Sequence, residues 1–183
     1  MEGTSPFVSR PEFDNKLGYP GELPEDWKEK TIEKMGDLLS RYRSLRVFMD
    51  SCIKCGACTD KCHYFIGTQD PKNMPVGRQD LLRKVYRRYF TFAGKFFPKL
   101  VGAVDLTEEV IDTWYSYYHQ CSECRRCAVF CPMGIDTAEV TMAAREILAH
   151  LGKASKYSNE ILTKVSRIGN NLGLPGPALQ GIL

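Results

Sequence analysis

The eight cysteines of the chain are the residues whose types and spacing carry the clearest chemistry. They form two runs with the same spacing, C-x2-C-x2-C-x3-C, and none is left over. The first run is Cys52, Cys55, Cys58 and Cys62, and the second is Cys121, Cys124, Cys127 and Cys131. The first residues contain no basic segment followed by an apolar run, so no secretory signal is expected and a reducing compartment is favoured. In such a compartment clustered thiols are metal ligands more often than disulfides.

Both cysteine runs have the spacing of bacterial ferredoxins that hold two [4Fe–4S] clusters. Three thiolates at this spacing converge on one cluster from a single loop, while the fourth cysteine, about one helical turn further on, points toward the other cluster. We therefore expect crossed ligand sets. One cluster would be held by Cys52, Cys55, Cys58 and Cys131, and the other by Cys121, Cys124, Cys127 and Cys62. Structural zinc is the alternative metal.

Two oxidised clusters would change the charge of the protein. The formal charge is +3, and two clusters with their thiolates add about −4, which gives about −1. Lys54, Arg125 and Arg126 lie inside the ligand loops. Each either offsets cluster charge or is a solvated surface side chain. His63 follows Cys62 and either hydrogen-bonds a cluster sulfur or replaces a turn residue.

The segments around the cysteines have helical periodicity, and no convincing strand pattern occurs. Residues 1–24 are rich in proline and glycine and read as an extended arm. One amphipathic helix is expected from residue 25 to Cys52, with Ile32, Met35, Leu39, Tyr42 and Met49 on its apolar face. Further helices are expected over about 82–92, 105–118, 136–151 and 155–170.

Side-chain patterns specify three of these helices further. In the first, Leu82, Val85, Tyr89 and Phe92 form an apolar face, and Arg83, Lys84, Arg87 and Arg88 occupy the other face. The next two helices would start with capping boxes, Asp105 with Glu108 and Asp136 with Glu139. The sequence therefore predicts an all-α fold in three parts: an N-terminal arm (1–24), a two-cluster α-helical ferredoxin domain (25–171) and a linker (172–183).

Three segments resemble a known superfamily: the cysteine run 52–62, the stretch Met-Pro-Val-Gly-Arg-Gln-Asp-Leu-Leu at 74–82, and residues 121–136. They are similar to the α-helical ferredoxins of heterodisulfide reductases, glycolate oxidase iron–sulfur subunits and succinate dehydrogenases. Within that superfamily the resemblance is to DsrK-type, HdrD-like iron–sulfur subunits of the membrane complex associated with sulfite reduction. Such subunits carry adjacent Cys-Cys pairs after the ferredoxin. This chain has none, so we expect the linker to lead to a further domain.

The resemblance implies electron transfer in a membrane-associated oxidoreductase of sulfur metabolism. Electrons would come from a cytochrome-b-like, quinol-oxidising haem subunit and reach a thiol or disulfide site on a small sulfur-carrier protein. The chain would be cytoplasmic and attached to the membrane through partner subunits. Alternatives are an HdrC-like relay subunit of a soluble heterodisulfide reductase, or the iron–sulfur subunit of a glycolate, lactate or glycerol-3-phosphate dehydrogenase.

The remaining residues suggest no substrate chemistry. The three histidines do not have H-x3-H spacing and no phosphate-binding loop occurs, so we expect no catalytic residue. The most apolar stretch, 89–106, is interrupted by charges and proline, so no membrane-spanning helix is expected.

The stretch from Arg78 to Lys99 is basic, with seven cationic residues and one acidic residue among aromatic side chains. Several of these aromatic residues share the helix face of Leu82 and Val85 and are expected in the core. Nucleic-acid binding is therefore not expected, and an anionic membrane, an acidic partner or a solvated face fits better.

Overall fold

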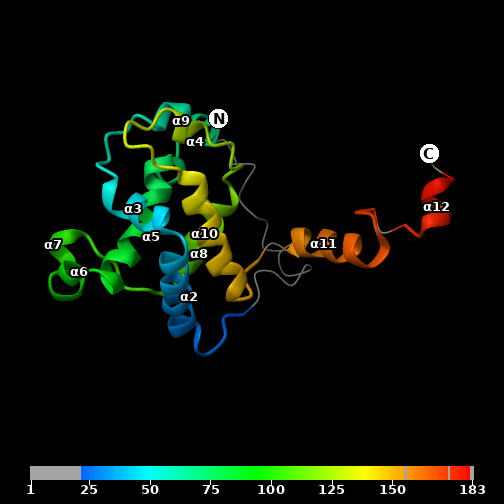
Figure 1. Cartoon of the computed structure of the whole chain (residues 1–183), viewed down its shortest axis with the longest axis horizontal. Coiled ribbons are helices and arrows are strands. Elements are labelled where there is room, and N and C mark those ends of the chain that lie inside the picture. Colours follow the sequence, from blue (N-terminus) through cyan, green and yellow to red (C-terminus); the bar gives the residue numbers. More distant parts are fainter. Residues whose placement is uncertain (1–21, 155, 173, 182–183) are drawn as a thin grey trace, which may run out of the picture.

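The computed structural model describes residues 22–154, 156–172 and 174–181 (Figure 1). In these ranges all regular structure is helical, which confirms the predicted all-α fold. Most of the predicted arm, residues 1–21, lies outside the described residues. The helices are α2 (Trp27–Arg41), α3 (Arg43–Ser51), η1 (Thr59–Lys61), α4 (His63–Thr68), η2 (Pro71–Asn73), α5 (Pro75–Phe90), α6 (Phe92–Phe96), α7 (Pro98–Val101), α8 (Glu108–His119), α9 (Arg126–Val129), α10 (Thr137–His150), α11 (Lys156–Ile168) and α12 (Gly176–Gln180).

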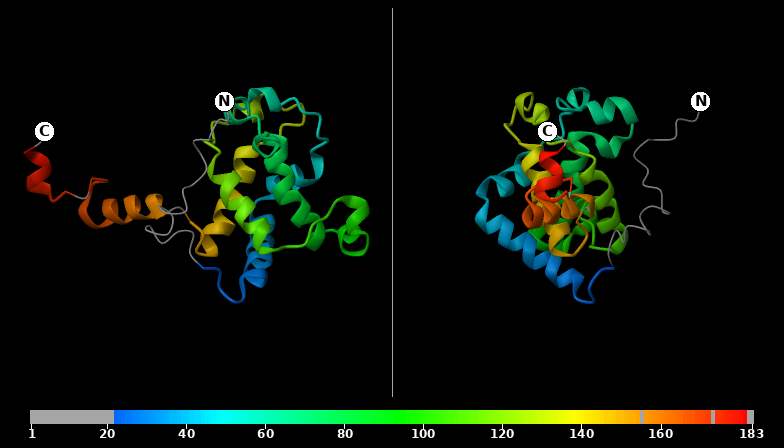
Figure 2. Two further views of the ribbon diagram at one scale, coloured as in Figure 1. Left: turned by 180° about the vertical axis from the view of Figure 1, so that it is seen from behind. Right: turned by 90° about the vertical axis from the view of Figure 1, so that its right-hand side faces the viewer.

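Helix α10 lies at the centre of the bundle and packs against α2, α5 and α8 (Figure 1). Its buried face includes Val140, Ala144 and Ile147, and α8 contributes Trp114 and Tyr118 to the same core. The short helices α4 and α9 and the loops beside them gather at one end of this bundle (Figure 1). Helices α11 and α12 extend away from it (Figures 1 and 2).

The single helix predicted between residue 25 and Cys52 is wrong, because the chain forms α2 and α3 instead. Tyr42 interrupts them with an extended backbone, φ −108° and ψ 91°, and its N–H donates to the Leu38 carbonyl to end α2. The break rotates the apolar stripe. Leu38 and Leu45 are therefore in the core, while Tyr42, predicted on the apolar face, is exposed.

One of the two predicted capping boxes also fails. Helix α8 starts at Glu108, and its N-cap is Thr107, whose hydroxyl accepts from the Val110 N–H. Asp105 instead pairs with Arg88. At α10 the N-cap is Asp136, as predicted, and its carboxylate accepts from the Ala138 N–H.

The buried face of α5 differs from the predicted one. Leu82 and Val85 are buried as expected, but Arg83, predicted on the polar face, is buried too. Its guanidinium donates to the Cys52 carbonyl at 2.6 Å, which satisfies the charged group inside the protein. Phe92 was predicted on the apolar face of α5 but lies in α6 and is exposed, because the helix stops at the extended residue Thr91.

Residues 91–104 form a projection that we call the α6–α7 tip (Figures 1 and 2). It lies close against the end of α5. A β-carbon built on Gly94 would lie 1.8 Å from the carbonyl oxygen of Arg87, so only glycine fits there. The Thr91 hydroxyl accepts from the Gly94 N–H and caps α6.

We expect Gly94→Ala to destabilise the protein by about 2 kcal/mol or more, because the added methyl group must push α6 off α5. The free energy of unfolding, from denaturant titration followed by far-UV circular dichroism, measures this cost. Gly67→Ala in α4 is the matched control, since nothing lies within 4 Å of its built β-carbon. That control should be neutral or stabilising by about 0.5 kcal/mol. Equal stability of the two variants would contradict the close approach.

Candidate metal centre

The two cysteine loops have the same backbone conformation. In the first loop Lys54 and Gly56 have positive φ values of 56° and 80°, and in the second Glu123 and Arg125 have φ values of 56° and 58°. These pairs occupy equivalent positions, two and four residues after the first cysteine of each run. Left-handed residues in such turns direct backbone N–H groups into a concave surface that suits anions and iron–sulfur clusters. In the second loop the Glu123 N–H donates to the Cys121 sulfur at 3.4 Å.

Two hollows lie beside these loops, and each takes cysteines from both runs. The first hollow is lined by Cys52, Cys55, Cys58 and Cys131, and the second by Cys62, Cys121, Cys124 and Cys127. We call these groups the first site and the second site. Cys127 and Thr137 line both hollows, so the two sites adjoin. The structure thus brings together the residues of each predicted ligand set.

The thiols surround a hollow rather than a single point. Among the described residues, no three or more His, Cys, Asp or Glu side chains meet closely enough for one metal ion. A tetrahedral zinc ion would need its sulfur ligands within about 4 Å of one another. The wider spacing suits a larger metal core.

The N-termini of the two longest helices beside the loops form part of the hollows. Pro75 and Val76 of α5 and Thr137 and Ala138 of α10 line them. The Val76 N–H bonds the sulfur of Cys58. Because a helix N-terminus carries a partial positive charge, both helices stabilise negative charge at the two sites.

Burial makes two of the thiols poor thiolates without a metal. Desolvation raises the pKa of Cys58 to about 11, against the smaller opposing effect of the Val76 N–H. Desolvation also raises the pKa of Cys127, although the Thr137 side chain bonds it and acts in the opposite direction. A bound cationic core would supply the charge that favours both thiolates. This donor set therefore fits an iron–sulfur cluster better than a free nucleophilic cysteine.

Arg78 is a residue that the sequence analysis missed at this centre. Its side chain is buried, with 1% exposure, and its Nη1 lies 3.6 Å from the Cys62 sulfur. The guanidinium also donates to Asn73 Oδ1 at 2.8 Å and to the Tyr117 carbonyl at 3.1 Å. A signal was present in the sequence. Arg78 stands four residues before Leu82, which places it on the apolar face of α5.

The cations predicted inside the loops have carboxylate partners or are exposed. Lys54 pairs with Asp80 at 2.8 Å, and Arg125 pairs with Asp136 at 3.2 Å. Arg126 is exposed. Because Asp80 and Asp136 each belong to or cap α5 or α10, these pairs fasten the loops to the two helices.

His63 lies at the rim of the second hollow. Its Nε2 is 3.4 Å from the Ser122 hydroxyl, and its ring contacts Tyr64. No contact between its imidazole and a cysteine sulfur is seen in the part of the chain that the structure describes. This geometry agrees with the interpretation of His63 as an exposed turn residue.

Two arginines hold the two loops in matching ways. Arg83 of α5 donates to the Cys52 carbonyl, and Arg145 of α10 donates to the Cys121 carbonyl. Cys52 and Cys121 are the first cysteines of their runs. Each arginine is the ninth residue of its helix, since α5 starts at Pro75 and α10 at Thr137. The two halves of the centre are therefore built on one plan.

The comparisons with known proteins agree with this plan. Residues 48–135 match the family of 4Fe–4S dicluster domains. The chain is 54% identical over 161 residues to the Hdr-like menaquinol oxidoreductase iron–sulfur subunit 2 of Archaeoglobus fulgidus, a match that covers 88% of this chain and 29% of that protein. It is 51% identical over 159 residues to the Hdr-like menaquinol oxidoreductase iron–sulfur subunit of Archaeoglobus profundus, covering 87% of this chain and 28% of that protein.

A third relative belongs to the dihydromethanophenazine:CoB–CoM heterodisulfide reductase of Methanosarcina acetivorans, of which it is one polypeptide. It is 30% identical over 105 residues, 57% of this chain and 25% of that protein. The chain thus spans less than a third of the length of these curated relatives. No solved structure matches it.

The fold and the site define an all-α iron–sulfur protein with a 4Fe–4S dicluster domain. Within this class the chain belongs with the HdrD-like iron–sulfur subunits, which confirms the resemblance seen in the sequence. The prediction of [4Fe–4S] clusters as cofactors is confirmed as well. Across the described residues, no helix has both the length and the apolar character needed to cross a membrane.

Proposed function

We propose that the chain conducts electrons through two [4Fe–4S] clusters held by crossed ligand sets. The first site would hold one cluster through Cys52, Cys55, Cys58 and Cys131, and the second would hold the other through Cys121, Cys124, Cys127 and Cys62. The observation that carries the proposal is the composition of the two hollows, each lined by three cysteines of one run and the fourth cysteine of the other. When bound, the clusters supply one-electron redox chemistry.

The geometry supports conduction rather than substrate conversion. The two sites adjoin through Cys127 and Thr137, so electrons have a short path between them. Each site also reaches solvent through one exposed cysteine, Cys55 in the first and Cys124 in the second. Every cysteine is used as a ligand, which leaves no thiol to attack a disulfide. The chain therefore takes and passes electrons, and substrate chemistry belongs to a partner or to another domain.

The relatives suggest the setting for this electron transfer. Two of them are named menaquinol oxidoreductase subunits, and a third is named as part of a heterodisulfide reductase. We place this chain in a membrane-associated oxidoreductase that takes electrons from a quinol-oxidising, cytochrome-b-like haem subunit. The acceptor would be a thiol or disulfide site on a small sulfur-carrier protein. The chain would lie on the cytoplasmic side, attached through these partner subunits.

Purified without oxygen, the chain should be brown and bind about eight iron atoms and about eight acid-labile sulfides, because two cubane clusters contain that many. Iron and sulfide analysis of the protein measures both. Stoichiometric zinc without sulfide would contradict the proposal.

Crossed ligation predicts which cluster each fourth cysteine supports. We expect Cys131→Ser to perturb the cluster whose other ligands include Cys55, and Cys62→Ser to perturb the cluster whose other ligands include Cys124. Electron paramagnetic resonance of the reduced variants reads out each cluster. Cys55→Ser and Cys124→Ser serve as matched controls, since they mark the two clusters through cysteines inside the loops. If Cys131→Ser gave the spectrum of Cys124→Ser instead, the ligand sets would follow the sequence and not cross.

A further inference from the structure

The two halves of the metal centre share one plan, but one buried charge is not shared. Arg78 is the fourth residue of α5, and the fourth residue of α10 is Val140. Both are buried. Arg78 contacts the sulfur of Cys62, the fourth cysteine of its run, whereas Val140 offers only apolar atoms. The second site therefore has a buried cation against a ligand sulfur.

We infer that Arg78 is a positioning residue that raises the reduction potential of the second site above that of the first. This inference rests on the proposed ligand sets. A cluster gains one negative charge when it is reduced, so a nearby cation stabilises the reduced form more than the oxidised form. Little solvent screens the guanidinium at 1% exposure. An electron delivered by an external donor therefore resides on the second site in the singly reduced protein.

Other charges near the sites do not cancel this difference. Arg83 and Arg145 act on equivalent carbonyls in the two loops, so their effects on the two sites are alike. Lys54 and Arg125 are each offset by a carboxylate, Asp80 or Asp136. In contrast, the partners of Arg78 besides Cys62 are the neutral oxygens of Asn73 and Tyr117, so its positive charge is not neutralised.

The test is a dithionite titration of the full chain, with the two clusters followed by electron paramagnetic resonance and assigned with Cys62→Ser. We expect Arg78→Gln to keep about eight iron atoms and to lower the midpoint of the second site by about 59 mV, a tenfold change in its reduced-to-oxidised ratio. Arg78→Lys, which keeps the charge, should restore most of the shift. Arg83→Gln is the matched control and should leave that midpoint unchanged.

An unchanged midpoint in Arg78→Gln with full iron content would overturn the inference while leaving the proposed function intact. Full iron content and an unchanged second cluster in Cys62→Ser would instead overturn the ligand sets. If Arg78→Gln lost its cluster, the Arg78→Lys variant would decide: a midpoint equal to that of the first site would also overturn the inference.

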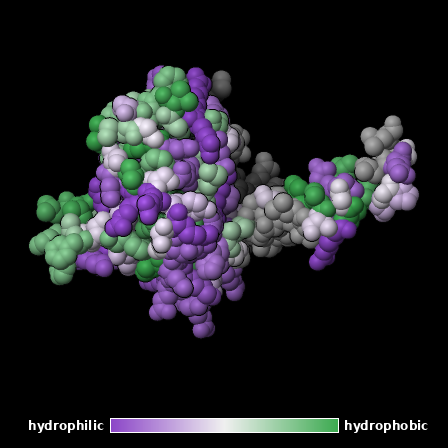
Figure 3. All heavy atoms as spheres, in the orientation of Figure 1, coloured by the Kyte–Doolittle hydropathy of each residue, from purple (hydrophilic) through white to green (hydrophobic). Residues whose placement is uncertain are grey.

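A different observation concerns the α6–α7 tip. Its four large apolar side chains are exposed: Phe92 by 77%, Phe96 by 64%, Phe97 by 61% and Leu100 by 85%. Together they expose on the order of 500 Å² of apolar surface, as much as the largest patches of ordinary monomers. Figure 3 shows this hydrophobic projection at the side of the molecule.

The tip is held firmly at its base. Arg87 donates to the Val101 carbonyl at 2.9 Å, and Arg88 pairs with Asp105 at 2.6 Å. With the close approach of Gly94 to α5, these contacts fix the tip while its aromatic side chains stay outside. They also correct the expectation that the aromatic residues of this stretch lie in the core.

The charges of the tip select its partner. Residues 91–104 include Lys95 and Lys99 and no acidic residue. Both lysines are exposed, and neither forms an ion pair with the residues that the structure describes. Because the tip is convex and smaller than the roughly 800 Å² that each partner buries in a standard protein interface, it suits a surface that needs no complementary pocket.

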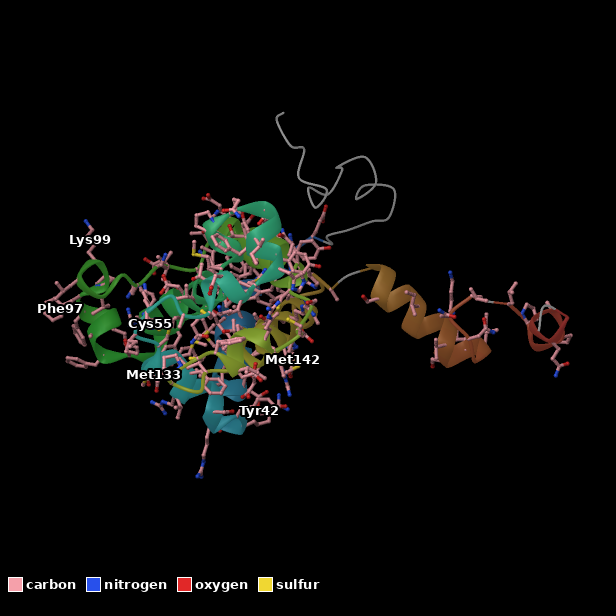
Figure 4. The ribbon with its side chains drawn as sticks, turned by 90° about the horizontal axis from the view of Figure 1, so that it is seen from above. Tyr42, Cys55, Phe97, Lys99, Met133 and Met142 are labelled. Carbon is pink, nitrogen blue, oxygen red and sulfur yellow. The ribbon has the colours of Figure 1, made fainter. Side chains whose placement is uncertain are left out.

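The geometry points to an anionic lipid bilayer, with the phenylalanines in the headgroup region and the lysines at the phosphates. In Figure 4 Phe97 and Lys99 extend on the same side of the molecule as Cys55. Docking by the tip would therefore turn the exposed edge of the first site toward the membrane side.

Sedimentation of the full chain with vesicles tests this docking. We expect binding to phosphatidylcholine vesicles that contain about one-third phosphatidylglycerol, weakening as salt is added. Phe96→Asn with Phe97→Asn should weaken it about tenfold, and Lys95→Glu with Lys99→Glu should abolish the preference for anionic lipid. Val47→Asn on α3 is the matched control, because Val47 is 56% exposed away from the tip.

Iron content should be the same in all these variants. Absence of vesicle binding by the unaltered chain, or equal binding by the tip variants, would overturn the lipid assignment. If the tip variants bound vesicles normally but no longer copurified with a membrane subunit, the tip would be a protein interface and the lipid assignment would again be wrong.

Discussion

Negative charge held inside a small helical bundle is the constraint on which the rest of this structure depends. Thiolates at partly buried positions are costly, as the raised pKa values of Cys58 and Cys127 show. Helices α5 and α10 meet this cost by directing their N-termini at the hollows. Both helices also form the core with α2 and α8, so the elements that stabilise the fold also stabilise the site.

The same two helices position the loops. Arg83 and Arg145 each hold the carbonyl of the first cysteine in a run, from the same place along each helix. The loops share their left-handed residues as well. Arg125 adopts this conformation without being glycine, and its ion pair with the N-cap Asp136 helps to hold it there. Loop shape and helix position are thus coupled.

The sequence predicted the parts that depend on local spacing. The two cysteine runs indicated the clusters, and helical periodicity indicated α5, α8 and α10. It failed where tertiary contacts decide. The break at Tyr42 has no glycine or proline to announce it, and periodicity alone assigned Arg83 to the solvent. Arg83 and Arg78 are buried because each finds oxygen or sulfur acceptors that come from distant segments. Hydrophobic pattern cannot report such partners, since it scores an arginine as polar wherever the acceptors lie. The exposed Phe92, Phe96 and Phe97 are the converse case: they were assigned to the core because they are apolar, although the chain turns out of α5 at Thr91.

The asymmetry between the two sites has a cause in the chain between cysteines and helices. Twelve residues separate Cys62 from Pro75, but five separate Cys131 from Thr137. The longer segment contains η2, which supplies Asn73 as an acceptor for the guanidinium of Arg78, and Asn73 is itself fixed by donating to Gln120 at 2.8 Å. A buried guanidinium without such acceptors would be strongly destabilising. The short segment before α10 offers no comparable acceptor among the described contacts, and an apolar Val140 is what that position accommodates. The insertion is therefore what allows one half of a repeated plan to carry a charge that the other half cannot.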